Sequence, residues 1–111
     1  MVKKIFDTYG YEGASVEDLA HIIEDVVGVE LRACEGLYAG ETYRYNGGFS
    51  DEIVIGNSTE YDQSVYPILV RVSNTYGKNA DNISKSKYIK QRMLLIPKMH
   101  LISQDIIETV N

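Results

Sequence analysis

The hydrophobic periodicity of this chain changes at Gly28. From Val16 to Val27 the apolar residues recur at helical spacing and form one stripe, with Ser15 in the position of an N-cap. From Val29 to Cys34 apolar and polar residues alternate, which is typical of a strand covered on one face. A one-sided helix and one-sided strands must bury their apolar faces against each other. The change of period therefore predicts an α+β domain with two layers.

Further segments rich in branched and aromatic residues predict that the sheet is mostly antiparallel. Asn46-Gly47-Gly48 suits a tight hairpin turn, and residues 57–66 form a long loop of the kind that often carries function. A second helix should end before Pro97, because the residue preceding proline is pushed out of the α region. The expected order is strand Lys3–Tyr9, helix Val16–Val27, strands Val29–Cys34, Glu41–Tyr45, Glu52–Ile55 and Ile68–Ser73, helix Asn79–Leu95 and strand Met99–Ile107.

Both helices are expected to pack on the same face of this sheet. In the second helix, Ile83, Ile89, Met93 and Ile96 lie roughly on one side. The predicted core joins the stripe of Leu19, Ile23 and Val27 to strand residues Val29, Leu31, Ala33, Ile68, Val70 and Val72.

The chain is predicted to be a single domain over residues 1–111. Its 44% hydrophobic content allows a chain of this length to bury somewhat over about 60% of the surface of its unfolded form. The single cysteine, Cys34, cannot form an internal disulfide, and the start MVKKIFDTYGYEG has no apolar stretch of signal or membrane-span length. These features predict a cytoplasmic protein that does not bind membranes.

Charge is distributed unevenly along the chain. From Ile5 to Asp62 there are 13 acidic residues and 2 arginines, whereas the other residues carry 9 Lys and Arg against 3 acids. An anionic segment of this size repels nucleic acid and attracts basic proteins. The pattern favours a basic protein as the partner, and an ordinary solvated acidic surface is an equally weighted alternative.

Motifs for metal, nucleotide or nucleophilic chemistry are not found in the sequence. Cys34, His21 and His100 are too few and too far apart for a zinc pattern, and the glycines form no phosphate-binding loop. His21 is interpreted as a solvated residue on the polar side of the first helix. The sequence therefore predicts a protein with no cofactor and no enzymatic activity.

Four parts of the sequence are informative when taken together: SVEDLAHIIEDVVGVELRACEGLYAGETYRYNGG, DEIVIGN, YPILVRV and the final KQRMLLIP followed by MHLIS. Together they resemble the small immunity proteins of bacterial polymorphic toxins, including those of contact-dependent growth inhibition systems. The resemblance implies a cytoplasmic inhibitor that binds one cognate toxin domain and blocks its active site. That toxin is expected to be a basic nuclease, with an RNase favoured over a DNase. The resemblance assigns no role to any single residue.

The partner surface is expected in the acidic, tyrosine-rich middle of the chain, because carboxylates and tyrosine hydroxyls can compete for cations that bind phosphate. Two other functions are kept open: a phage-type acidic mimic of nucleic acid that inhibits a host DNA-binding protein, and a small ligand-binding domain. A concave pocket would favour the last of these. The predicted partner-binding residues are Glu35, Tyr38, Glu41, Tyr43, Tyr45, Asp51, Glu52, Glu60, Tyr61 and Asp62.

Overall fold

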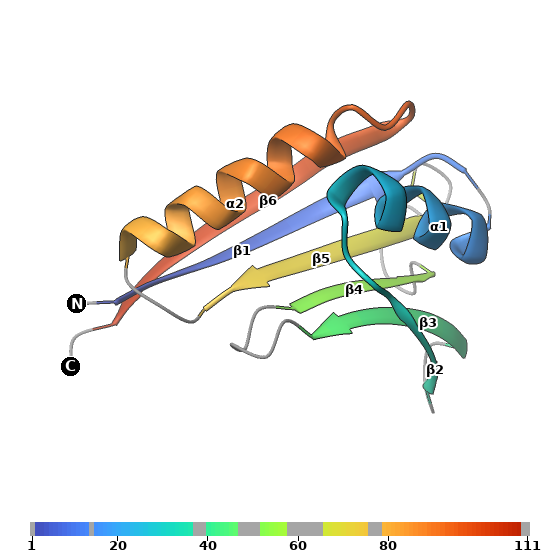
Figure 1. Cartoon of the computed structure of the whole chain (residues 1–111), viewed down its shortest axis with the longest axis horizontal. Helices are drawn as coiled ribbons and strands as arrows, with labels where there is room; N and C mark the ends of the chain where they lie inside the picture. The colour runs from blue at the N-terminus through green and yellow to red at the C-terminus, as the bar shows by residue number, and fades with distance from the viewer. Residues whose placement is uncertain are drawn as a thin grey trace.

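The computed structural model describes residues 2–13, 15–36, 40–46, 52–57, 66–75 and 79–109, which form two helices and one sheet (Figure 1). The six strands follow the order β2-β3-β4-β5-β1-β6, and every neighbouring pair is antiparallel. The α+β class and the predicted order of elements are confirmed. The elements are β1 (Val2–Tyr11), α1 (Val16–Val27), β2 (Arg32–Gly36), β3 (Gly40–Asn46), β4 (Glu52–Asn57), β5 (Ile68–Asn74), α2 (Asn79–Met93) and β6 (Met99–Thr109).

Helix α1 has the limits that its sequence predicts. The Ser15 side chain accepts a hydrogen bond from the backbone N–H of Asp18 at the first turn. Gly28 ends the helix with a φ of 82°, a left-handed conformation in which a β-carbon would be strained. The apolar stripe is buried, so the opposite side of α1, which carries the charged residues, faces solvent.

The two faces of the sheet differ in what covers them. Both helices lie on one face, where α1 packs against β3 and β4 and α2 packs against β1 and β5 (Figure 1). Along β5 the side chains of Ile68, Val70 and Val72 are buried beneath the helices, whereas Arg71 points to the other, open face. The strand and helix residues that form the centre of the predicted core are thereby confirmed.

The predicted strand Val29–Cys34 is shorter than expected, because pairing begins only at Arg32. The backbone N–H of Leu31 donates instead to the Glu24 carboxylate, at 3.0 Å. Leu31 is half-buried and Ala33 is exposed, so the prediction that Ala33 belongs to the core is wrong. The physical reason is that β2 is the outermost strand, and α1 packs over β3 and β4 instead.

Helix α2 ends at Met93, two residues earlier than predicted, and its inner side is partly polar. Ile83, which was expected to face the sheet, exposes 43% of its surface. Asn82 and Ser86 are buried in its place. Ser86 donates to Asp7 and Asn82 donates to the Lys3 carbonyl, so polar contacts with β1 determine which side of α2 faces inward.

Two predicted connections fall largely outside the described residues. The β3 and β4 strands pair with Asn46 opposite Glu52, as a hairpin requires, but the turn itself lies in residues 47–51, outside that part of the chain. Of the long loop at 57–66, residues 58–65 are likewise outside it.

Candidate functional site

The outer side of α1 and the segment after it form an acidic surface, made of Glu17, Asp18, Glu24, Asp25 and Glu30. All of these except the half-buried Glu24 are exposed. The helix contains no lysine or arginine, and its first turn holds two of the acids. Because the buried stripe fixes the rotation of α1, the carboxylates are held on a rigid element with their charges toward solvent.

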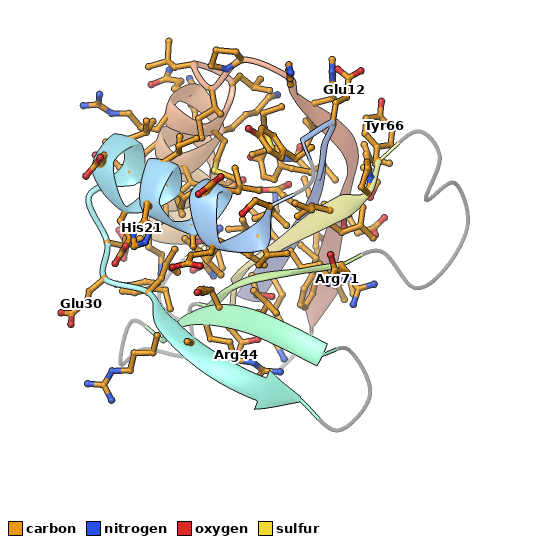
Figure 2. The ribbon with its side chains drawn as sticks, turned by 90° about the vertical axis from the view of Figure 1, so that its right-hand side faces the viewer. Glu12, His21, Glu30, Arg44, Tyr66 and Arg71 are labelled. Carbon is orange, nitrogen blue, oxygen red and sulfur yellow. The ribbon has the colours of Figure 1, made fainter. Side chains whose placement is uncertain are left out.

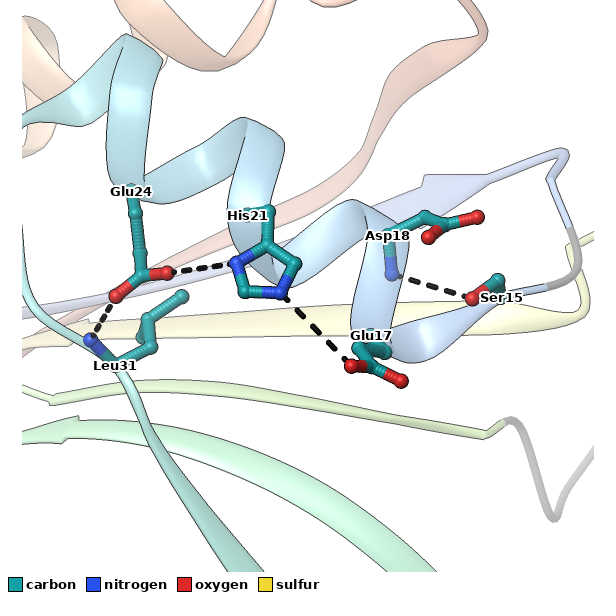
Figure 3. A network of polar contacts seen from close by, with 6 residues as sticks. All are labelled: Ser15, Glu17, Asp18, His21, Glu24 and Leu31. Carbon is teal, nitrogen blue, oxygen red and sulfur yellow. Dashed lines mark hydrogen bonds and ion pairs between the residues drawn. The ribbon is translucent and has the colours of Figure 1, made fainter.

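A small polar network links α1 to the start of β2 (Figure 3). The two oxygens of Glu24 serve different partners: Oε1 accepts from Nδ1 of His21 at 3.2 Å, and Oε2 accepts from the Leu31 backbone N–H at 3.0 Å. The other ring nitrogen of His21, Nε2, lies 4.0 Å from Oε1 of Glu17. The ring is exposed, as the sequence predicts for a solvated histidine. Glu24 therefore has a structural role. The outward members of the acidic surface are Glu17, Asp18, Asp25 and Glu30.

Three arginines lie together on the open face of the sheet. Arg32 is opposite Arg44 in the β2–β3 pair, and both Arg44 and Arg71 are register partners of Val54. The three arginines are exposed and form one row across the open face, which we call the arginine row. Figure 2 shows Glu30 and Arg71 on opposite sides of the molecule. Sequence reasoning counted two of these arginines but missed the row, because only the strand register brings them together.

A second group of side chains lies where β1 ends and β6 begins. His100 Nε2 is 2.7 Å from a Glu12 carboxylate oxygen, and the centroid of the His100 ring is 5.7 Å from that of the Tyr66 ring. Figure 2 shows Glu12 and Tyr66 at the same end of the molecule. A β-carbon at Gly10 would meet the Tyr66 ring, so glycine is what allows the ring to lie against β1. Tyr66 is thus part of the packing on the open face.

The structure does not bring the described members of the predicted partner surface onto one face. Tyr43 and Tyr45 pack against the core on the helix-covered face, and Tyr45 is the register partner of Ile53. Glu52 precedes Ile53, so its half-buried side chain points to the open face. The backbones of Glu35 and Glu41 are register partners. The other predicted members lie outside the described residues: Tyr38, Asp51, Glu60, Tyr61 and Asp62.

No family model and no curated protein matches this chain. Among the described helices, none is long and apolar enough to cross a membrane. In the same part of the chain, no three histidine, cysteine or acidic side chains are grouped so that they could hold a metal ion. The function of the domain is therefore inferred from its own surfaces and cavities.

A pocket of about 480 Å³ opens between the C-terminal end of α1, helix α2 and the sheet. Its walls include Val27, Val29, Ile53 and Ile89, and its polar residues include Tyr45, Asn74, Ser84, Lys85 and Tyr88. A volume of this size falls within the range of about 300–1,000 Å³ that is usual for small-molecule sites. The pocket could not be predicted from the sequence, since its lining residues come from five different helices and strands and from the connection after α1.

Proposed function

We propose that this protein is a cytoplasmic immunity protein. It binds one basic toxin domain, a nuclease, and blocks the active site of that nuclease without any turnover of its own. The observation that carries the proposal is the acidic surface: exposed carboxylates on a capped helix that contains no lysine or arginine. The resemblance of the sequence to immunity proteins of polymorphic toxins supports the same function.

The acidic surface suits a nuclease as partner for an electrostatic reason. A nuclease binds phosphates with lysine, arginine or histidine, and an inhibitor that presents carboxylates can occupy the same cations. Glu17, Asp18 and Asp25 are displayed by a helix whose inner stripe is buried, so little backbone order has to be gained on binding. The acids therefore favour both rapid association and a defined geometry.

The arginine row adds an orienting effect. It lies on the open face of the sheet, whereas α1 lies on the other face. A basic partner is attracted to the acidic surface and repelled by the arginine row, so encounters are biased toward α1. The acidic pair of register partners Glu35 and Glu41, together with the other residues predicted from the sequence, remains a predicted extension of this surface.

Titration of the cognate toxin domain with this protein tests the proposal. Nuclease activity should fall to zero at one molecule of this protein per toxin, measured on both RNA and DNA substrates. Inhibition at sub-stoichiometric amounts would indicate catalysis, and no inhibition at equal amounts would contradict the proposal. If the captured partner is a host DNA-binding protein instead, the chain is the acidic mimic of nucleic acid.

Matched charge variants separate the acidic surface from net charge alone. The variant Glu17→Gln, Asp18→Asn, Asp25→Asn should slow association by about tenfold or more at low salt and weaken its salt dependence. The control Asp81→Asn, Asp105→Asn, Glu108→Gln removes the same number of negative charges from α2 and β6, and it should have a much smaller effect. Equal slowing in both variants would show that α1 is not the docking surface.

A further inference from the structure

Asn74 brings an unpaired amide to the pocket between the two helices. It is the last residue of β5 and exposes 1% of its surface. Among the residues that the structure describes, neither its side-chain nitrogen Nδ2 nor its oxygen Oδ1 has a hydrogen-bond partner, and the residue lines the pocket. Burying an amide without partners destabilises a fold, and such groups are few in folded proteins. A position that keeps this amide beside a cavity is therefore suited to a ligand that supplies the missing bonds.

The amide specifies the complementary chemical group. Asparagine presents an acceptor oxygen and a donor nitrogen side by side in one plane, so it pairs best with a group that has an adjacent donor and acceptor. A carboxamide or a cyclic amide meets this requirement. Because Asn74 is covered, a ligand bonds to it only as neighbouring side chains move aside.

The remaining lining of the pocket specifies the rest of the ligand. Ile53 and Ile89 provide apolar walls and Tyr45 and Tyr88 provide aromatic surface, which suits a flat ring. Among the described residues, the lining includes one cation, Lys85, and no carboxylate.

A second positive charge lies close to the pocket. The Arg92 guanidinium is 5.5 Å from the centroid of the Tyr88 ring. On the opposite side, Val27 and Gly28 bring the C-terminal end of α1, which carries partial negative charge. A negatively charged group of the ligand is therefore favoured on the α2 side, near Lys85.

We infer that this pocket binds a small aromatic or heteroaromatic amide that carries an anionic group. The amide pairs with Asn74, the ring lies between the apolar walls, and the anion lies toward Lys85. This site does not rest on the inhibitor function, since it uses none of the outward carboxylates of the acidic surface. It gives the domain a binding site for a small molecule in addition to a protein-binding surface.

Three related probes test each part of this ligand by NMR titration of the isotope-labelled protein: 3-carbamoylbenzoate, benzamide and benzoate. Only the first has both the amide and the anion. It should shift the side-chain amide resonances of Asn74 and bind about tenfold or more tightly than either of the other two. The inference is overturned if all three bind equally, or if none of them shifts the Asn74 resonances.

Variants then assign the contacts. Asn74→Leu should abolish the preference for 3-carbamoylbenzoate over benzoate. Lys85→Gln should weaken the binding of 3-carbamoylbenzoate by about tenfold and leave the binding of benzamide unchanged. This variant tests the site even if Asn74→Leu does not fold. Lys87→Gln is the matched control, because Lys87 is exposed on α2 and is not among the pocket-lining residues. Equal effects of the two lysine variants on the binding of 3-carbamoylbenzoate would overturn the inference.

Discussion

Ser86 donates a buried hydrogen bond of 2.7 Å to the carboxylate of Asp7, which joins α2 to strand β1 across 79 residues of sequence. Gln104 Nε2 lies 3.4 Å from the Ser86 hydroxyl, and Oδ1 of Asp7 has no partner among the described residues. Asp7 exposes only 1% of its surface, so its hydrogen bond with Ser86 replaces water at the interface between helix and sheet.

The Ser86–Asp7 contact predicts an asymmetric response to substitution. Ser86→Ala should lower the free energy of unfolding by about 1.5–3 kcal/mol, because it leaves a buried carboxylate without its hydrogen-bond donor. The double variant Asp7→Leu, Ser86→Ala should recover most of this loss, since both polar groups are then removed together. Denaturant unfolding measures both values, with Ser84→Ala, an exposed position on the same helix, as the control. Additive losses in the double variant would contradict the pairing.

Tyr9 predicts a loss of stability at alkaline pH. Burial raises the pKa of the Tyr9 hydroxyl above its usual range, and the nearby Asp7 carboxylate adds to this effect. The unfolded chain loses this proton near pH 10, whereas the folded chain keeps it to higher pH. The contribution of Tyr9 to stability is therefore complete below about pH 10 and declines as the pH rises from there toward the folded-state pKa.

Replacing the Tyr9 hydroxyl tests this pH dependence. The Tyr9 hydroxyl has no hydrogen-bond partner in the described part of the chain, so Tyr9→Phe should be at least as stable as the parent at neutral pH. Between about pH 8 and about pH 11, the free energy of unfolding should fall less in Tyr9→Phe than in the parent. The half-buried Tyr11 is the control position for Tyr→Phe. If the free energy of unfolding fell equally at alkaline pH in Tyr9→Phe and in the parent, this pH dependence could not be assigned to Tyr9.

Replacing Lys98 with glycine should stabilise the fold. The Met99 backbone N–H donates to the Ile96 carbonyl at 3.2 Å, Pro97 follows Ile96, and Lys98 has a φ of 69°. This is the geometry of a type II turn, whose third residue favours glycine. Lys98→Gly should raise the free energy of unfolding by up to about 1 kcal/mol, because relief of left-handed strain exceeds the extra entropy of an unfolded glycine. Lys87→Gly, within α2, should instead lower it by about 1 kcal/mol. Thermal unfolding of both variants measures whether each substitution raises or lowers the free energy of unfolding.

The core should respond unequally at Ile55 and at Leu31, of which the sequence predicts only Leu31 in the core. Ile55 is fully buried beneath α1, so Ile55→Ala should lower the free energy of unfolding by about 2–5 kcal/mol. Leu31 is half-buried outside the sheet, so Leu31→Ala should cost less than about 2 kcal/mol. Equal costs, measured by denaturant unfolding, would favour the strand register expected from the sequence.

The sequence predicts the parts of this fold that depend on local signals. The limits of α1 follow from its stripe, Ser15 and Gly28, and β5 follows from its branched residues. The inner side of α2 could not be predicted, because Asn82 and Ser86 become buried only through contacts with β1, which is distant in the sequence. Periodicity treats such polar residues as solvent-facing.

The candidate sites show the same division between local and long-range information. The acids of α1 could be assigned to its outer side from the sequence, but the arginine row depends on the β2–β3 and β4–β5 registers. The pocket at Asn74 depends on how two helices meet the sheet. Neither feature leaves a periodic signal in the chain.

The position of β1 between β5 and β6 affects how the domain is made. During synthesis β1 leaves the ribosome well before β5 and β6, which are its neighbours in the described part of the sheet. The β1–β6 edge of the sheet therefore cannot form until the last strand has been released, and its rate of formation is governed by loop closure over most of the chain. Lys3, Lys4 and Asp7 place charges on this waiting strand, which limits its pairing with other nascent chains.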